Sequence, residues 1–205
     1  MIMKLYLIRH GESQDAKNGI TQRTDSPLSE VAIDQLKIVK ENLKGISFDR
    51  VFSSPFPRAL QTAKELFPGQ DIRVLDYLHE YIRPECLNGV EKEIGKHFWE
   101  VEHKEDKYFP DWKYDGCESF NGIVSRVKKL TAFLSTLKDK QTIAIVGHGV
   151  FFRHLIGYLL MSDNYKPEIF FDLLLKIEIA NGGGAVLDLN LESNSATIKS
   201  INNFV

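Results

Sequence analysis

The chain has 205 residues, of which 43% are hydrophobic and 26% are charged, as is ordinary for one folded soluble domain with a sizeable core. Its formal net charge at pH 7 is -2, which argues against a general nucleic-acid binder and against a membrane-surface binder, because both need a strongly basic face. Any site for an anion must therefore be local.

The first half of the chain alternates predicted strands with predicted helices. Short apolar runs predict strands over residues 4–8, 51–53 and 72–75. Apolar residues at helical spacing predict helices over residues 28–43 and 55–66. In the first of these helices we assign Val31 to the buried face, together with Ala32 and Leu36. Strands that alternate with helices are typical of a largely parallel sheet.

The second half adds a long amphipathic helix and then a strand and a helix, over residues 119–137, 142–146 and 150–161. The tail has a different pattern. Three apolar runs, separated by glycines or by Ser-Asn, predict a terminal antiparallel meander over residues 173–179, 185–191 and 196–201. We see neither an internal repeat nor a low-complexity linker, so we interpret residues 1–205 as a single domain.

The two cysteines, Cys86 and Cys117, form no CxxC pair and are too few for a disulfide framework, so we interpret them as inert thiols. The start of the chain lacks the long apolar core of a signal peptide, and no later stretch is long enough to span a bilayer. These features predict a reducing, cytoplasmic location.

The segment KLYLIRHGES carries the strongest functional signal. Its Arg9 and His10 follow an apolar strand directly and precede Gly11. A buried strand that ends in this way delivers two nitrogen-rich side chains to the carboxyl edge of a sheet. In open α/β folds, ligands bind at that edge.

Two later segments predict further side chains at the same edge. In FDRVFSSPFPRALQTA, Arg58 falls in the first turn of the helix that follows the second strand. In TIAIVGHGVFFRHL, His148 follows a strand and precedes a helix. Two arginines and two histidines so close together repel one another unless an anion neutralises them, and helix N-termini add partial positive charge. The cluster therefore predicts a binding site for a phosphate monoester.

On these segments the chain resembles the histidine phosphatase superfamily, the cofactor-dependent phosphoglycerate mutase-like proteins. The resemblance rests on LIRHGES, SSPFPRALQTA, the glutamate of YLHE, GCESF and VGHGVFFR, and it extends from the first strand to about Arg153. It implies an α/β fold with three layers (α/β/α), a mostly parallel sheet and an antiparallel C-terminal edge. It also implies that His10 is the nucleophile that becomes phosphorylated, that Glu80 is the general acid, and that the phosphate ligands are Arg9, Arg58 and His148.

The chemistry of these residue types agrees with the implied roles. A neutral imidazole can attack phosphorus and form a covalent phosphohistidine, so neither a metal ion nor another cofactor is required. Arginine forks suit bidentate capture of phosphoryl oxygens, and His148, when protonated, adds a third donor. A carboxylic acid can protonate the leaving oxygen. Glu80 is our candidate for that acid, Glu85 is its local rival, and further glutamates follow at Glu91 and Glu93.

The remaining histidines, at positions 79, 97, 103 and 154, lack paired metal-ligand spacing, so we interpret them as surface or packing residues and predict no metal site. Many family members carry an asparagine six residues after the nucleophilic histidine. This chain has Ala16 there, and Asn18 is the alternative source of that phosphate contact. Residues 81–115 mix aromatic and basic side chains. Such a mixture is typical either of a lid that steers an anionic substrate or of an amphipathic helix with a solvated lysine face.

We therefore expect a metal-independent phosphomonoester hydrolase of the histidine acid phosphatase type, acting on a phosphorylated small molecule or on a phosphoprotein side chain. The first alternative is a phosphoglycerate mutase-type phosphotransferase. The compact chain argues against it by family analogy, because a mutase needs a longer basic insert. The second alternative is a non-catalytic phospho-ligand-binding module, against which the intact His10 argues. Neither nucleic acid nor a membrane is an expected partner, and the sequence leaves the substrate and the oligomeric state open.

Overall fold

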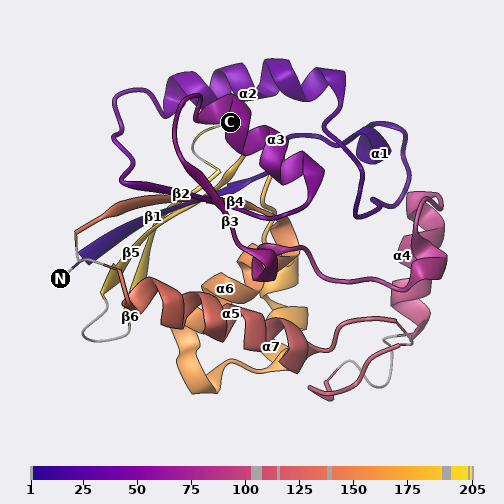
Figure 1. Ribbon diagram of the computed structural model, residues 1–205. Helices are drawn as coiled ribbons and strands as arrows, with labels where there is room; N and C mark the ends of the chain where they lie inside the picture. The colour runs from indigo at the N-terminus through magenta and orange to yellow at the C-terminus, as the bar shows by residue number, and fades with distance from the viewer. Residues whose placement is uncertain are drawn as a thin grey trace.

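The computed structural model describes residues 2–102, 108–114, 116–137, 140–190, 195–202 and 204. A sheet of six strands lies at the centre of this part of the chain, and helices cover both of its faces (Figure 1). The helices α2 (Glu30–Asn42) and α3 (Pro57–Leu66) lie on one face. On the other face lie α5 (Phe120–Ser135), α6 (Gly149–Met161) and α7 (Pro167–Asp172). The three layers implied by the family resemblance are therefore confirmed.

The strands are β1 (Ile2–Arg9), β2 (Arg50–Ser53), β3 (Ile72–Val74), β4 (Thr142–Gly147), β5 (Gly184–Asn190) and β6 (Ser195–Ile201). They lie side by side in the order β3-β2-β4-β1-β5-β6. The pairs β1–β4, β2–β4 and β2–β3 are parallel, whereas β1–β5 and β5–β6 are antiparallel. The carboxyl ends of β1, β4 and β2 consequently meet at one edge, which is the arrangement that the motifs require.

The prediction of the first strand of the C-terminal meander is wrong. Residues 173–179 follow α7 and contain a short 3-10 helix, Leu174–Lys176, instead of a strand. Pro167 occupies the first turn of α7, where its fixed φ favours a helix start. Leu174 then packs in an apolar cluster with Tyr165 and Phe170, whereas its neighbours Leu173 and Leu175 are exposed, so this run is not a strand of the sheet. The antiparallel edge consists of β5 and β6.

The assignment of Val31 to the buried face is also wrong. Its side chain is 46% exposed, whereas Ala32, Leu36 and Val39 are fully buried. The buried residues of α2 are these three, which lie on one side of the helix. Val31 lies outside this buried side. Ser29 caps the helix by accepting a hydrogen bond from the backbone N–H of Ala32 at 3.3 Å, so α2 begins at Glu30, two residues after the start predicted from the apolar spacing.

Several short elements were not assigned from the sequence pattern. They are α1 (Gln14–Lys17), α4 (Lys92–Glu102) and the 3-10 helices Asp76–Leu78, Glu85–Leu87 and Ser162–Asn164. The helix α4 lies apart from the layers, at the carboxyl end of β1 (Figure 1). Within the described ranges, no helix combines the length and the apolar character that a membrane span needs. Cys86 is exposed and Cys117 is buried, and no disulfide joins them.

Candidate active site

The two neighbouring parallel strands β1 and β4 position the two histidines of the motifs. His10 follows β1 directly and His148 follows β4 directly, because Arg9 pairs in register with Gly147. The backbone N–H of His10 donates to the carbonyl of Gly147 at 3.0 Å. The imidazole rings of His10 and His148 consequently lie 5.1 Å apart between centroids. The predicted convergence of the RHG and HG segments is present in the structure.

The contacts of His10 fix its tautomer. Its Nδ1 lies 2.7 Å from the carbonyl oxygen of Gly11, and its Nε2 lies 3.2 Å from Nε of Arg58. A carbonyl oxygen can only accept a hydrogen bond and a guanidinium can only donate one. The proton of the imidazole must therefore be on Nδ1, and the lone pair must be on Nε2. Burial of the ring, together with the charges of Arg58 and Arg9, lowers the pKa of His10 well below its usual 6.5.

Arg58 is held by a backbone carbonyl outside the motifs and by an aromatic ring within its own motif. Its Nη1 donates to the backbone carbonyl of Arg23 at 2.9 Å, and its guanidinium lies over the ring of Phe56. Arg23 in turn forms an ion pair with the buried carboxylate of Asp15, with Nη2 and Oδ1 2.7 Å apart. Burial lowers the pKa of Arg58 from its usual 12.5 to about 10, so the guanidinium stays charged at neutral pH.

The side chains of His148 and Arg9 each combine one hydrogen-bonded nitrogen with one buried nitrogen that has no partner among the described residues. Nε2 of His148 lies 2.8 Å from Oγ of Ser54, and its Nδ1 has no hydrogen-bond partner among the described residues. Nη1 of Arg9 donates to the carbonyl of Ile179 at 2.5 Å, whereas Nε of Arg9 is also without a partner there. Burial and the nearby cationic groups lower the pKa of His148 well below 6.5. The ring is neutral at pH 7 in this state, not the imidazolium considered from the sequence.

Glu80 is anchored at the N-terminus of α6. Its carboxylate accepts hydrogen bonds from the backbone N–H groups of Tyr81 at 2.9 Å, Phe151 at 3.0 Å and Val150 at 3.2 Å. These donors place the carboxylate in the first turn of the helix that begins after His148. By contrast, the rival glutamates are exposed on the surface, at positions 85, 91 and 93. The structure thus brings Glu80 to the cluster and leaves its rivals outside.

A second set of contacts fixes the segment that carries Glu80. Arg126 of α5 donates from Nη1 to the backbone carbonyls of Tyr77 at 2.9 Å and His79 at 2.7 Å. Its Nε and Nη2 pair with the carboxylate of Glu118 at 2.7 and 2.6 Å. This bidentate pair is largely buried and orients the guanidinium toward the two carbonyls. The peptide that precedes Glu80 is therefore tied to α5.

A cavity of about 310 Å³ opens beside the cluster. Its described lining residues are Arg9, Ile20, Thr21, Gln22, Glu80, Arg83, Lys92, Gly95, Lys96, Gly149, Val150 and Arg153. Two of the five predicted site residues, Arg9 and Glu80, are thus in its wall. The other three are buried beside Arg9, with exposed fractions of 1% for His10, 2% for Arg58 and 0% for His148. His10 is therefore not part of the described lining of the cavity.

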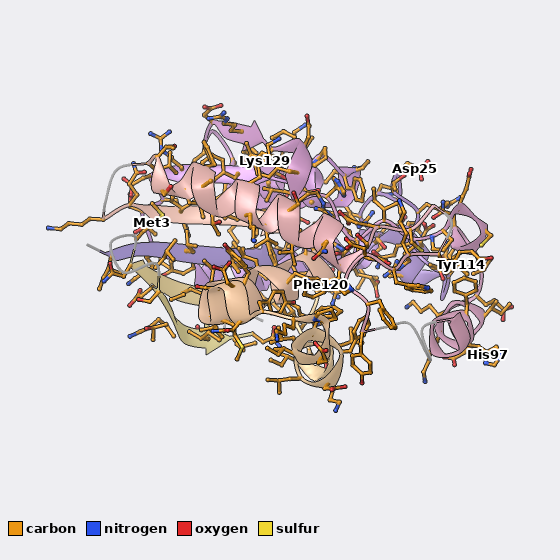
Figure 2. All side chains as sticks on the ribbon, turned by 90° about the horizontal axis from the view of Figure 1, so that it is seen from below. Met3, Asp25, His97, Tyr114, Phe120 and Lys129 are labelled. Atoms are coloured by element: carbon orange, nitrogen blue, oxygen red, sulfur yellow. The ribbon has the colours of Figure 1, made fainter. Side chains whose placement is uncertain are left out.

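The outer wall of this cavity comes from α4 and from the loop after α1. Figure 2 shows His97 of α4 and Tyr114 at the same end of the molecule as Asp25, opposite Met3. Backbone hydrogen bonds join the two segments: the N–H of Thr21 donates to the carbonyl of Val90 at 2.7 Å, and the N–H of Lys92 to the carbonyl of Gly19 at 3.1 Å. Of the two open interpretations of residues 81–115, the helix is confirmed at α4. The motion of a lid stays a prediction.

The structure does not bring Asn18 to the cluster. Asn18 is exposed, and its Oδ1 accepts a hydrogen bond from Nε2 of Gln14 at 3.1 Å. It is absent from the described lining of the cavity, whereas the carbonyl of Ala16 accepts from Nζ of Lys92 at 3.2 Å. The phosphate contact that family members draw from an asparagine therefore has no counterpart at Asn18 in this conformation.

The other histidines are not arranged as metal ligands. His154 is buried, stacks on Phe170 at 3.8 Å between ring centroids, and its Nδ1 lies in hydrogen-bond contact with the hydroxyl of Tyr165 at 2.9 Å. His79 stacks on Phe56, and His97 is exposed. Position 103 lies outside the described residues. Within the described part of the chain, no group of three or more His, Cys, Asp or Glu side chains is placed to hold a metal ion.

Sequence reasoning missed several residues that prepare the site. They are Asp15, Arg23, Ser54, Thr62, Arg126 and Arg153. Oγ1 of Thr62 accepts a hydrogen bond from the N–H of Gly11 at 3.1 Å and donates one to the carbonyl of Arg58 at 2.7 Å. Thr62 therefore links the loop after β1 to α3. Ser54 lies within the quoted motif directly after β2, a position that could have indicated its role. No sequence pattern indicates a role for Asp15 or Arg23, because they contact Arg58 only through the backbone carbonyl of Arg23.

Comparison with known proteins places this geometry in a family. The family model described as histidine phosphatase superfamily (branch 1) matches residues 5–202. The chain is 30% identical over 170 residues to the adenosylcobalamin/alpha-ribazole phosphatase of Salmonella typhimurium, over 77% of this chain and 80% of that protein. The structure of the alpha-ribazole phosphatase from Shigella flexneri has a TM-score of 0.78 at 25% identity, covering 99% of this chain and 98% of the other. The phosphoserine phosphatase from Entamoeba histolytica in complex with 3-phosphoglyceric acid has a TM-score of 0.72 at 26% identity, covering 98% and 97%.

Proposed function

The chain belongs to the histidine phosphatase superfamily, and on that premise we propose that it hydrolyses phosphomonoesters through a covalent phosphohistidine on His10, without a metal ion. The observation that carries this proposal is the tautomer of His10. Its Nδ1–H is donated to the carbonyl of Gly11, so Nε2 keeps its lone pair next to the charged guanidinium of Arg58. A neutral, oriented imidazole beside fixed cations is what attack on a phosphate dianion needs.

In the first step, Nε2 of His10 attacks phosphorus and the bond from phosphorus to the substrate's alcohol oxygen breaks. Arg9, Arg58 and His148 hold the three phosphoryl oxygens. Two nitrogens that lack a partner among the described residues, Nε of Arg9 and Nδ1 of His148, are available to donate to them. Because these donors are fixed and buried, they stabilise the charge that spreads over the oxygens during transfer. Glu80, as a carboxylic acid, gives its proton to the leaving oxygen.

In the second step, water attacks the phosphohistidine in line. The carboxylate of Glu80 takes a proton from that water, the bond from Nε2 to phosphorus breaks, and inorganic phosphate leaves with His10 neutral again. The position of Glu80 supports both roles, because it lines the cavity at the start of α6, whereas the other glutamates of this region are exposed. The same residue thus acts first as acid and then as base.

Transfer to a second hydroxyl, as in a mutase, is the competing outcome for the same intermediate. The relatives reported above are phosphatases by name, which supports hydrolysis. Their names include alpha-ribazole and phosphoserine, and one of them is in complex with 3-phosphoglyceric acid. We therefore propose a small phosphorylated metabolite as the substrate in preference to a phosphoprotein side chain.

The test is phosphate release from p-nitrophenyl phosphate in the presence of a chelator, next to an assay for conversion of 3-phosphoglycerate to 2-phosphoglycerate. We expect metal-independent release, no mutase activity, and complete loss of release in His10→Ala. His97→Ala, which removes an exposed histidine of α4, serves as the matched control and keeps the activity. Activity that disappears on chelation and returns with a divalent cation, or that survives in His10→Ala, contradicts the proposal.

A further inference from the structure

The cavity beside the cluster carries far more positive charge than one phosphoryl group requires. Five of its described lining side chains are cationic and one, Glu80, is a carboxylate. The cations are Arg9, Arg83, Lys92, Lys96 and Arg153. The whole chain has a net charge of -2, so this concentration is local and does not follow from composition. Arg9 already belongs to the phosphoryl site, which leaves four cations with no role in the proposed reaction.

We propose that the leaving alcohol of the substrate carries a second anionic group, a carboxylate or a phosphate, which Arg83, Arg153 and the α4 lysines bind. This inference rests on the proposed function and names the substrate class of the same cavity. It assigns the recognition of the leaving alcohol to Arg83, Arg153 and α4.

Arg83 is the residue that most directly indicates a second anion. It is half-buried, and no carboxylate partner for it exists among the described residues. Its charge reaches the phosphoryl site, because it lowers the pKa of both Arg9 and Arg58. The charge of Glu80 offsets part of this repulsion, because it raises the pKa of both arginines, but it is one carboxylate among three guanidiniums. The repulsion that remains destabilises the empty cavity. An anion between them removes that cost.

Arg153 of α6 is a further cation of the described cavity lining. Its Nε donates to the carbonyl of Ile177 at 2.6 Å, which fixes the guanidinium in the wall. Burial lowers its pKa, while the charges of Glu80 and Glu178 act in the opposite direction. A planar fork held by one backbone contact is suited to bind a carboxylate or a phosphate.

Lys92 and Lys96 are one turn apart on α4, so they lie on the same face of that helix. Gly95 lies between them, and a Cβ at this position would lie 2.8 Å from Oγ1 of Thr21. The glycine therefore lets α4 approach Thr21 closely enough to bring the lysine face to the cavity. A volume of about 310 Å³ is near the lower end of the range for small-molecule sites, roughly 300 to 1,000 Å³, which fits a compact substrate.

The experiment compares three phosphate esters of matched primary alcohols: propyl phosphate, the phosphate ester of 3-hydroxypropanoate, and the bisphosphate of 1,3-propanediol. They differ in a neutral, carboxylate or phosphate end. We expect kcat/KM for both charged esters to exceed that for propyl phosphate by about 10-fold or more, the size of a charge-assisted hydrogen bond of about 1.5 kcal/mol. Arg83→Met and Lys96→Met each lower this ratio, whereas Lys40→Met, which removes an exposed lysine of α2, leaves the ratio unchanged.

Binding of the same three esters to His10→Ala, followed by calorimetry, separates this inference from the proposed function. Selective binding of the charged esters without any hydrolysis by the wild type supports the second-anion site and overturns the phosphatase. Hydrolysis of all three esters at equal efficiency, with equal affinities in His10→Ala, supports the phosphatase and overturns the second-anion site. The ester with the larger preference identifies whether the second group is a carboxylate or a phosphate.

Discussion

At the scale of single residues, the site depends on hydrogen-bond partners that leave His10 only one tautomer. The carbonyl of Gly11 and the guanidinium of Arg58 allow His10 one tautomer. Arg58 is itself oriented through the carbonyl of Arg23, which the buried carboxylate of Asp15 holds. Burial of Asp15 opposes its ionisation, but the hydrogen bonds from Arg23 and Ser26 outweigh this and hold the pKa of Asp15 below its usual value. The nucleophile thus depends on a chain of contacts that begins at Asp15.

The first prediction concerns Glu80, whose role as the acid follows from its place in the cavity wall. Glu80→Gln keeps the shape of the side chain and removes the transferable proton. General acid catalysis is worth about 10²–10⁴-fold, so phosphorylation of His10 by an alkyl phosphate should slow by roughly that factor. An aryl phosphate should lose much less, because its leaving group departs without protonation. Single-turnover kinetics isolates this step from the later hydrolysis.

Glu85→Gln is the matched control for this prediction, because Glu85 is exposed and lies outside the described lining of the cavity. It should leave both substrates unaffected. Equal losses for the alkyl and the aryl phosphate in Glu80→Gln would show that another residue supplies the proton.

At the scale of elements, the helices act as fixed supports for short loops that carry the chemistry. The helix α6 holds the carboxylate of Glu80 through backbone N–H groups, and α5 holds the preceding peptide through Arg126. The ion pair between Arg126 and Glu118 is largely buried and is therefore largely shielded from water. We infer that Arg126 is a positioning residue that acts through Glu80.

The second prediction follows from this support. Arg126→Met should slow the phosphorylation step for an alkyl phosphate by on the order of 10²-fold, since a misplacement of about 1 Å at a reacting group costs that much. The aryl phosphate should lose less, as in Glu80→Gln. The double variant Glu118→Gln/Arg126→Met should show the same substrate dependence with a smaller loss of stability, because it leaves no unpaired carboxylate. Equal slowing of both substrates, in step with a lowered urea midpoint, would instead indicate a purely structural role.

At the scale of the whole molecule, the sequence pattern predicted the largely parallel sheet and its carboxyl edge well, because both depend on local patterns. The three layers were implied by the family resemblance. The β-branched run of β4 and the RHG and HG turns place His10 and His148 side by side once the strands are parallel. The segment over residues 173–179 was mispredicted, because an apolar run does not reveal whether a sheet or a helix pair buries it. The roles of Asp15 and Arg126 could not be predicted, since each acts through a backbone carbonyl of a distant segment.

The third prediction concerns stability and pH. Three buried histidines, His10, His148 and His154, have pKa values well below 6.5 because burial disfavours their charged form. Below about pH 6.5 the unfolded chain binds protons that the folded chain does not, so stability falls with decreasing pH by about 1.4 kcal/mol per pH unit for each group. This loss continues until the pH reaches the folded pKa.

Urea denaturation between pH 7.5 and 5.5 checks this sign. His154→Gln keeps a hydrogen-bond partner for the hydroxyl of Tyr165 but has no titrating ring. Its free energy of unfolding should therefore depend on pH less steeply than that of the wild type, by the contribution of one histidine. Identical slopes for the two proteins would mean that His154 titrates in the folded state as it does in the unfolded one.

The central claim is that His10 carries the phosphoryl group, and trapping the intermediate tests it most directly. The wild-type protein is mixed with a phosphomonoester, quenched in alkaline denaturant, digested and analysed by mass spectrometry. The account predicts one phosphorylated peptide, modified at His10, with a phosphate that is lost in acid and kept in base, and no such peptide from His10→Ala. Phosphate found on a different residue, or full turnover by His10→Ala, would contradict it.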